Sequence, residues 1–170
     1  AYFQRKNLNI YLRINQKLYT MITLRIDNIT RIPLCYQKTD HPVPISVKIE
    51  LTGRCNFRCG YCPVIKRADK AQDMDFMLFK RITTEMAQLG VKEIGVFYMG
   101  ESFTNKQLLV DAIRFLKREL EIPYVFLTSN ASLADIITVE RCMMAGLDSL
   151  KWSCNVADAE QFSRSEEHTS

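Results

Sequence analysis

The chain has 170 residues, of which 47% are apolar and 25% charged, so it is long enough to bury the core of one domain or most of one. It contains no apolar run near the roughly 20 residues that a membrane span needs and no secretory leader, which excludes a membrane-spanning or secreted protein and predicts a cytoplasmic one. The net charge of +4 is concentrated in residues 1–44, and no basic cluster alternates with aromatic residues. Nucleic acid is therefore not an expected partner.

Residues 1–44 form a predicted N-terminal extension. Apolar residues recur every four positions from Ile10 to Ile26, which favours a basic amphipathic helix, whereas residues 7–15 alternate as a strand would. We expect a helix that packs ahead of the next domain. A helix that binds a membrane surface or an acidic partner is the alternative.

The next segments alternate between strand and helix signals. Residues 45–52 are rich in β-branched residues and predict a first strand. Residues 75–90 predict a helix, with Asp75 as its N-cap and Gly90 as its stop. One face of this helix carries a predicted buried stripe of Phe79, Ile82, Met86 and Leu89.

The same alternation continues to residue 154. We expect a strand over 91–99, a helix over 105–121, a strand over 124–129, a helix over 133–146 that stops at Gly146, and a strand over 149–154. The second of these helices should bury Leu109, Ala112, Ile113, Leu116 and Leu120. Such βαβ units predict an α/β fold with a parallel sheet and with its chemistry at the carboxyl ends of the strands.

Half of the six cysteines, Cys55, Cys59 and Cys62, follow directly on the first predicted strand. Disulfides are not expected in a reducing cytosol, and a closed zinc site lacks ligands because no second cysteine pair exists. The two histidines fall in the extension and the tail. Three thiolates on a four-iron cluster would leave one iron open for reaction. Cys35 and Cys142 are expected to be small buried side chains without a metal.

The cysteine segment, CNFRCGYC, has the pattern C-x3-C-x-aromatic-C and resembles the cluster motif of radical S-adenosylmethionine (SAM) enzymes. The resemblance extends from about Ile45 to Val156 through YMGES, LTSNASL and AGLDSLKWSCN. It implies a parallel (β/α) barrel that stops after about four βα units, with a [4Fe–4S] cluster held by the three cysteines. SAM would chelate the open iron, and an external donor such as flavodoxin or ferredoxin would supply the electron that cleaves SAM to a 5′-deoxyadenosyl radical.

The resemblance also implies which residues hold SAM. Gly100 and Glu101 would meet the methionyl ammonium group, although Met99 and Ser102 stand where many members have glycine and proline. The alternative for Glu101 is an exposed acidic loop tip. Residues at the ends of the third and fourth strands would hold the ribose and carboxylate, with turn capping as their alternative role. These residues are Ser129, Asn130, Ser153 and Asn155, and Ala131 stands where a glycine is common.

Strand alternation places Lys48, Glu50 and Thr52 on the interior face of the barrel, together with Lys151 and Ser153. Because buried charges pair, Glu50 should contact Lys48 or Lys151. No catalytic side chain is assigned. The similar enzymes often carry an auxiliary-cluster domain and modify peptides or build cofactors. The alternative function is a non-catalytic iron–sulfur electron carrier or metal-binding module.

The chain starts at Ala1 rather than Met, and residues 164–170 read RSEEHTS, with no apolar periodicity. We expect this tail to be non-native sequence derived from a sequencing adapter, with an ordinary disordered terminus as the alternative. The predicted domain organisation is therefore an extension over 1–44, a partial radical SAM core over 45–163 and a tail over 164–170.

Overall fold

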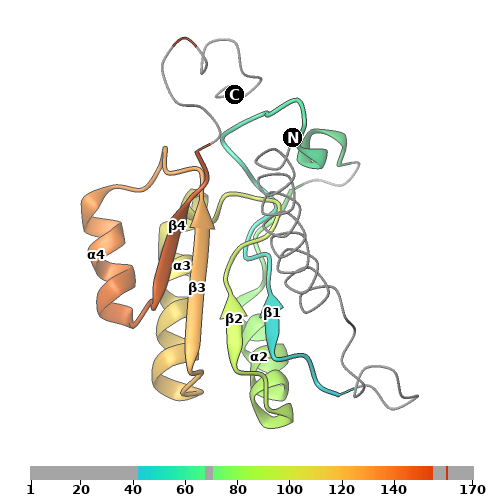
Figure 1. Ribbon diagram of the computed structural model, residues 1–170, viewed down its shortest axis with the longest axis vertical. Helices are drawn as coiled ribbons and strands as arrows, with labels where there is room; N and C mark the ends of the chain where they lie inside the picture. Colours follow the sequence, from blue (N-terminus) through green and yellow to red (C-terminus); the bar gives the residue numbers. More distant parts are fainter. Residues whose placement is uncertain (1–41, 68–70, 155–159, 161–170) are drawn as a thin grey trace, which may run out of the picture. The chain divides into compact units, whose positions relative to one another are not determined.

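A computed structural model describes residues 42–67, 71–154 and 160 (Figure 1). Most of the predicted N-terminal extension and the whole predicted tail lie outside these ranges, as do Cys35, both histidines and Asn155. The predicted helix within residues 1–44, the boundary at 45 and the origin of residues 164–170 therefore stay predictions.

Four strands form one sheet in the order β1-β2-β3-β4, and every neighbouring pair is parallel. The strands are β1 (Ser46–Lys48), β2 (Glu93–Gly95), β3 (Tyr124–Ser129) and β4 (Ser149–Trp152). The predicted α/β fold with a parallel sheet is confirmed. All four carboxyl ends therefore lie at one edge of the sheet, which is where loops from different strands can build a common site.

Three strands are shorter than predicted, and only β3 spans its predicted residues. The strand predicted over 91–99 ends at Gly95. The Val96 amide still donates to the Phe126 carbonyl at 3.0 Å, but the Met99 amide donates to the carboxylate of Glu50 at 3.1 Å. A side chain thus replaces a neighbouring strand as the partner of the Met99 amide.

Helix α2 (Phe76–Leu89) begins and ends where the sequence predicts. The Asp75 carboxylate accepts from the Leu78 amide at 2.8 Å, and Gly90 ends the helix with φ of 97°. Phe79 is buried, but Leu89 is 64% exposed, so its assignment to the buried stripe is wrong. Leu89 is the last residue of α2 and lies beyond Met86 and Ala87, which pack against the core.

Helix α3 (Lys106–Arg114) follows a 3-10 turn (Ser102–Asn105) and continues into a π-helical turn, η4 (Phe115–Glu119). The predicted inward residues Leu109, Ala112, Ile113 and Leu116 are buried, whereas Leu120 is only half-buried.

Helix α4 (Ile136–Ala145) begins three residues later than predicted because Asp135 caps it, accepting from the Thr138 amide at 2.9 Å. It ends at Gly146 as predicted.

The hydrophobic core lies between one face of the sheet and the helices; Figure 1 shows α2 and α3 behind the strands. Ile94, Val125 and Leu127 of the strands are buried against this side. The rings of Phe79 and Phe115 meet edge to face with centroids 6.5 Å apart, which joins α2 to the π-helical turn. Within the described ranges, every helix is too short or too polar to cross a bilayer.

A separate polar cluster joins the amino ends of β3 and β4. The Lys117 ammonium donates to the carbonyls of Ile122 and Pro123, each at 3.1 Å, and to Asp148 Oδ2 at 2.9 Å. Asp148 Oδ2 also accepts from the Val125 amide at 2.7 Å. Lys117, in the middle of the π-helical turn, is thereby linked to both strands at the edge opposite their carboxyl ends.

Candidate functional site

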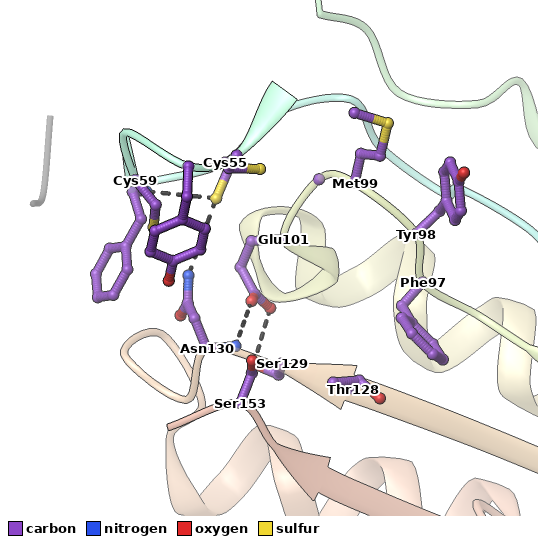
Figure 2. Close-up of a pocket in the computed structure, with 14 residues that line it drawn as sticks. Cys55, Cys59, Phe97, Tyr98, Met99, Glu101, Thr128, Ser129, Asn130 and Ser153 are labelled. Atoms are coloured by element: carbon purple, nitrogen blue, oxygen red, sulfur yellow. Dashed lines mark hydrogen bonds between the residues drawn. The ribbon is translucent and has the colours of Figure 1, made fainter. Parts of the chain in front are cut away.

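A cavity of about 200 Å³ opens at the carboxyl ends of the strands (Figure 2). Its wall comes from four segments far apart in sequence, one after each strand. The lining residues are Cys55, Phe57, Cys59, Tyr61, Cys62, Phe97, Tyr98, Met99, Gly100, Glu101, Thr128, Ser129, Asn130 and Ser153. The parallel order of the sheet therefore brings together all the sequence-predicted site residues that the structure describes.

The three cysteines lie on one wall of this cavity and are each half-buried. A turn in which the Cys62 amide donates to the Cys59 carbonyl at 2.8 Å brings two of them together. The Cys55 sulfur accepts from the Phe57 amide at 3.4 Å. Across residues 42–67, 71–154 and 160, no three His, Cys, Asp or Glu side chains converge closely enough to hold a metal ion.

The surroundings of Cys55 disfavour a negative charge on its sulfur. Burial raises the pKa of the Cys55 thiol, the Phe57 amide lowers it, and the negative charges of Glu101, Cys59 and Cys62 raise it further. A cationic centre among the three sulfurs would offset these repulsions, because a coordinating metal holds thiols deprotonated. The donor set, three thiols on one wall of a cavity, has the chemistry that a three-cysteine cluster needs, although the three side chains do not converge as a metal site in this structure.

Glu101 is buried, with 3% of its surface exposed, so the alternative of an exposed acidic loop tip is wrong. Its Oε1 accepts from the Ser129 hydroxyl at 2.9 Å and from the Phe103 amide at 3.0 Å, and its Oε2 accepts from the Asn130 amide at 2.8 Å. Figure 2 shows Glu101 between the cysteine loop and the end of β3. A carboxylate offers about four lone-pair positions, so three donors leave room for one more.

Gly100 allows two loops to touch. A Cβ at this position would lie 1.9 Å from the Thr52 carbonyl oxygen and 2.9 Å from the Arg54 carbonyl oxygen. The next amide, of Glu101, donates to that Arg54 carbonyl at 2.8 Å. Gly100 therefore has a packing role in holding the cysteine loop against the loop after β2, in addition to its predicted contact with SAM.

Ser129 and Ser153 end neighbouring strands. Ser129 is buried and donates its hydroxyl to Glu101, and the same oxygen accepts from the Ala131 amide at 3.0 Å, so it caps the turn and also bonds to Glu101 in the cavity wall. Ser153 is exposed, and its amide donates to the Ser129 carbonyl at 2.7 Å. Ala131 has φ of 69°, the left-handed region in which its methyl group is unfavourable.

A polar network that the sequence did not reveal joins the loops after β1 and β3. The Asn130 side-chain amide donates to Asn56 Oδ1 at 3.1 Å and reaches the Cys55 sulfur at 3.9 Å. The side-chain amide of Asn56 donates to the Ser132 hydroxyl at 2.6 Å. The backbone amide of Ser132 in turn donates to Asn130 Oδ1 at 3.1 Å. Only the presence of Asn or Ser in both loops could have indicated this contact.

The predicted pairing of Glu50 is wrong. Its partner is Arg67, at 2.7 Å, rather than Lys48 or Lys151. The reason is that Glu50 lies past the end of β1, where the returning segment after the cysteines brings a guanidinium group close. Lys48 instead places its ammonium group 5.4 Å from the centroid of the Phe97 ring, and Lys151 is exposed.

A second cleft, of about 420 Å³, lies beside the same cysteine loop. It is lined by Gly53, Arg54, Cys55, Phe57, Arg58, Val64, Arg67 and Ala71. Cys55 and Phe57 line both this cleft and the first cavity. The sequence carries no signal for this cleft, because isolated arginines beside a cysteine motif do not reveal which residues share a cavity.

The chain is similar in sequence to a known protein family and to several curated proteins. Residues 49–164 match the family model of the radical SAM superfamily. The chain is 29% identical over 116 residues to GTP 3′,8-cyclase of Chlorobaculum tepidum, which covers 68% of this chain and 34% of the relative. It is 30% identical over 122 residues to PqqA peptide cyclase of Granulibacter bethesdensis, covering 71% of this chain and 32% of the relative. The chain thus spans about a third of the length of these curated relatives.

The fold has a counterpart among solved structures. The crystal structure of BtrN in complex with AdoMet and 2-DOIA superposes with a TM-score of 0.59 at 16% identity, covering 70% of this chain and 49% of that chain. The matched relatives are enzymes, and members of the matched family use a [4Fe–4S] cluster and SAM. With a family match over residues 49–164 and a sheet of the same type, the chain belongs to the radical SAM superfamily.

Proposed function

We propose that this chain is the SAM-binding part of a radical SAM enzyme, in which Cys55, Cys59 and Cys62 hold a [4Fe–4S] cluster. The observation that carries the proposal is the cavity that these cysteines share with Glu101 and the ends of β3 and β4. When bound, the cluster supplies the electron that cleaves SAM into methionine and a 5′-deoxyadenosyl radical.

The chain's own residues would bind and orient SAM. The buried Glu101 offers a remaining acceptor position to the methionyl ammonium group, and a charged hydrogen bond of this kind contributes about 1.5–3 kcal/mol. Gly100 keeps the Glu101 loop against the cysteine loop. Ser129, Asn130, Ser153 and Asn155 would hold the ribose and the methionyl carboxylate, and Ser129 and Asn130 also fix the Glu101 carboxylate.

Hydrogen abstraction would then occur on a substrate bound beyond the SAM pocket. We propose peptide modification or cofactor biosynthesis as the setting, a cytoplasmic location, and flavodoxin or ferredoxin as the electron donor. The names of two matched relatives support this choice of settings. One relative is named for a peptide, and the other is named for GTP.

Anaerobic reconstitution tests the cluster. The protein should bind about four irons and four sulfides, and Cys55→Ala, Cys59→Ala and Cys62→Ala should each abolish binding. Cys142→Ala is the matched control, because Cys142 is fully buried in α4, away from the cavity, and should leave iron binding unchanged. Full folding with one equivalent of zinc in preference to iron would contradict the proposal.

Addition of SAM separates the enzyme from an iron–sulfur electron carrier, the alternative that the enzyme relatives do not favour. SAM should change the electron paramagnetic resonance spectrum of the reduced cluster, and dithionite should then release 5′-deoxyadenosine. A spectrum that saturating SAM leaves unchanged would favour the electron carrier instead.

A further inference from the structure

Two lysines lie on the face of the sheet that points away from the helices. The register places Lys48 of β1, Gly95 of β2 and Phe126 of β3 in one row across the sheet. Lys151 of β4 pairs with Thr128 of β3. Because Phe126 and Thr128 alternate with residues of β3 that are buried on the helix side, they and both lysines lie on the opposite face.

These two cations have no carboxylate partner among the described residues. Lys48 and Lys151 are exposed, and neither forms an ion pair within residues 42–67, 71–154 and 160. The carboxylate expected to pair with them, that of Glu50, is bonded to Arg67 instead. Glu93 of β2 lies on the same face, one row closer to the amino ends, and forms no ion pair with either lysine. Unpaired cations on one face create a positive potential that attracts an anion.

Aromatic rings form an apolar surface beside Lys48. The rings of Phe97 and Phe126 meet edge to face with centroids 5.7 Å apart, and Tyr124 stacks on Phe126 at 5.7 Å. The Lys48 ammonium group lies 5.4 Å from the centroid of the Phe97 ring. Gly95 makes room for this aromatic surface, since a Cβ there would lie 2.9 Å from the Phe126 ring and 3.0 Å from the Phe97 ring. The face therefore offers a cation and exposed ring surface side by side.

The aromatic surface continues into the cavity that contains Glu101. Phe97 and Thr128 line that cavity together with Glu101. Figure 2 shows Phe97 on the side of Glu101 that faces away from Cys59. A molecule lying on Phe97 would therefore reach the proposed SAM site at one end and Lys48 at the other.

We propose that Lys48, Phe97 and Phe126 form a subsite for a small organic oxyanion, a carboxylate or a phosphate, whose apolar part lies on the aromatic surface. That this anion is the substrate rests on the proposed function. Lys48 can meet the anion without breaking an ion pair, because its contact with Phe97 is a cation–π interaction at an exposed position. Hydrogen bonds between an ammonium group and an oxyanion are roughly twice as strong as neutral ones. Lys151 adds positive potential from the other edge of the same face.

The test measures the binding of four compounds to the anaerobically reconstituted protein by titration calorimetry at low ionic strength. Phenyl phosphate and phenylacetate carry a ring and an oxyanion, phenylacetamide carries the ring without charge, and inorganic phosphate carries charge without a ring. The preferred ring anion should have a Kd about 10-fold lower than that of phenylacetamide and of inorganic phosphate. Preference for phenyl phosphate would indicate a phosphate ester as the ligand, and preference for phenylacetate would indicate a carboxylic acid.

Variants of one lysine identify the cation responsible. Lys48→Gln should raise the Kd of the preferred anion about 10-fold and leave that of phenylacetamide unchanged, whereas Lys48→Arg keeps the charge and should stay within about threefold of wild type. Lys92→Gln is the matched control, because Lys92 is also exposed and forms no ion pair with a described residue, but lies just before the amino end of β2.

The outcomes separate this subsite from the proposed function. Equal Kd values for the anion in Lys48→Gln and Lys92→Gln, or equal Kd values for the anion and the amide in wild type, would overturn the subsite and leave the proposed function standing. A wild-type protein that binds no iron but still prefers the anion through Lys48 would overturn the proposed function and uphold the anion site.

Discussion

Gly100 contacts the carbonyl oxygen of Thr52 so closely that a Cβ at position 100 would lie 1.9 Å from it. Thr52 precedes the cysteine loop, and Gly100 precedes Glu101. The contact therefore fixes the relative position of the two segments that would hold the cluster and the SAM ammonium group.

We expect Gly100→Ala to force these loops apart. Insertion of a methyl group into a packed site costs typically 1–3 kcal/mol, and here the obstacle is backbone, which cannot rotate away. The variant should lose about this much stability in urea unfolding and should bind less iron. Gly90→Ala is the control, because Gly90 has φ of 97° but nothing within 4 Å of its Cβ position. It should lose about 1 kcal/mol and keep its iron, whereas equal iron binding in both variants would contradict the prediction.

Glu101→Gln tests whether the buried carboxylate is structural as well as SAM-binding. The amide group of Gln would meet donors from Phe103, Ser129 or Asn130 with a donor of its own. We expect a loss of about 1–3 kcal/mol in unfolding of the SAM-free protein, in addition to weaker SAM binding. Unchanged stability with weakened SAM binding would show that the hydrogen bonds to Ser129 and Asn130 add little to the fold.

Ala131→Gly should stabilise the protein. Ala131 has φ of 69°, and this conformation costs a residue with a Cβ about 1–2 kcal/mol. Glycine also gives the unfolded chain more conformational entropy, which offsets part of this relief. We therefore expect the free energy of unfolding in urea to rise by only about 0.5–1 kcal/mol. Ala112→Gly, in the buried face of α3, should instead destabilise by about 1 kcal/mol or more. A loss of stability for Ala131→Gly would contradict the strain at this turn.

The N-cap of α4 predicts a pH dependence. Hydrogen bonds from Lys106 and from the Thr138 side chain and backbone hold the pKa of Asp135 well below its usual range. A depressed folded-state pKa gives a stabilisation that is present above the unfolded value, near 3.9, and is lost as the pH falls through the folded value. NMR titration should therefore show Asp135 still ionised at about pH 3.

The variant Lys106→Gln should raise the pKa of Asp135 toward its ordinary value, because it removes the largest contribution. Arg141→Gln removes a positive charge from α4 itself and should have little effect, because Arg141 bonds to Gln107 and not to Asp135. A similar shift in both variants would indicate a general charge effect in place of the specific contact.

The parallel sheet and three of the helix ends could be predicted from the sequence because local signals encode them. Asp75 and Gly90 bound α2 through contacts within a few residues, and Gly146 does the same for the end of α4. The position of the cysteines at the carboxyl end of the first strand followed from the strand pattern and the order of the elements.

Contacts between loops could not be predicted in the same way. The Glu50 carboxylate pairs with Arg67 because the chain returns after the cysteines, and the path of that return depends on packing. Likewise, the burial of Glu101 depends on Ser129 and on the Asn130 amide, which come from the next strand. The residue types alone do not show which residues of another loop these two carboxylates contact.

The Lys117 and Asp148 cluster sits at the amino ends of β3 and β4, whereas the cavity lies at their carboxyl ends. Lys117 and Asp148 thus stabilise the sheet without lining the cavity, whereas Gly100 and Glu101 belong both to the packing of the loops and to the cavity wall. In a mutational scan, substitutions at Lys117 or Asp148 should deplete variants by lowering abundance, while those at Cys59 or Cys62 should remove function at normal abundance. Selection can consequently tune the thermal tolerance of this protein at the amino ends of the strands without changing the cavity at their carboxyl ends.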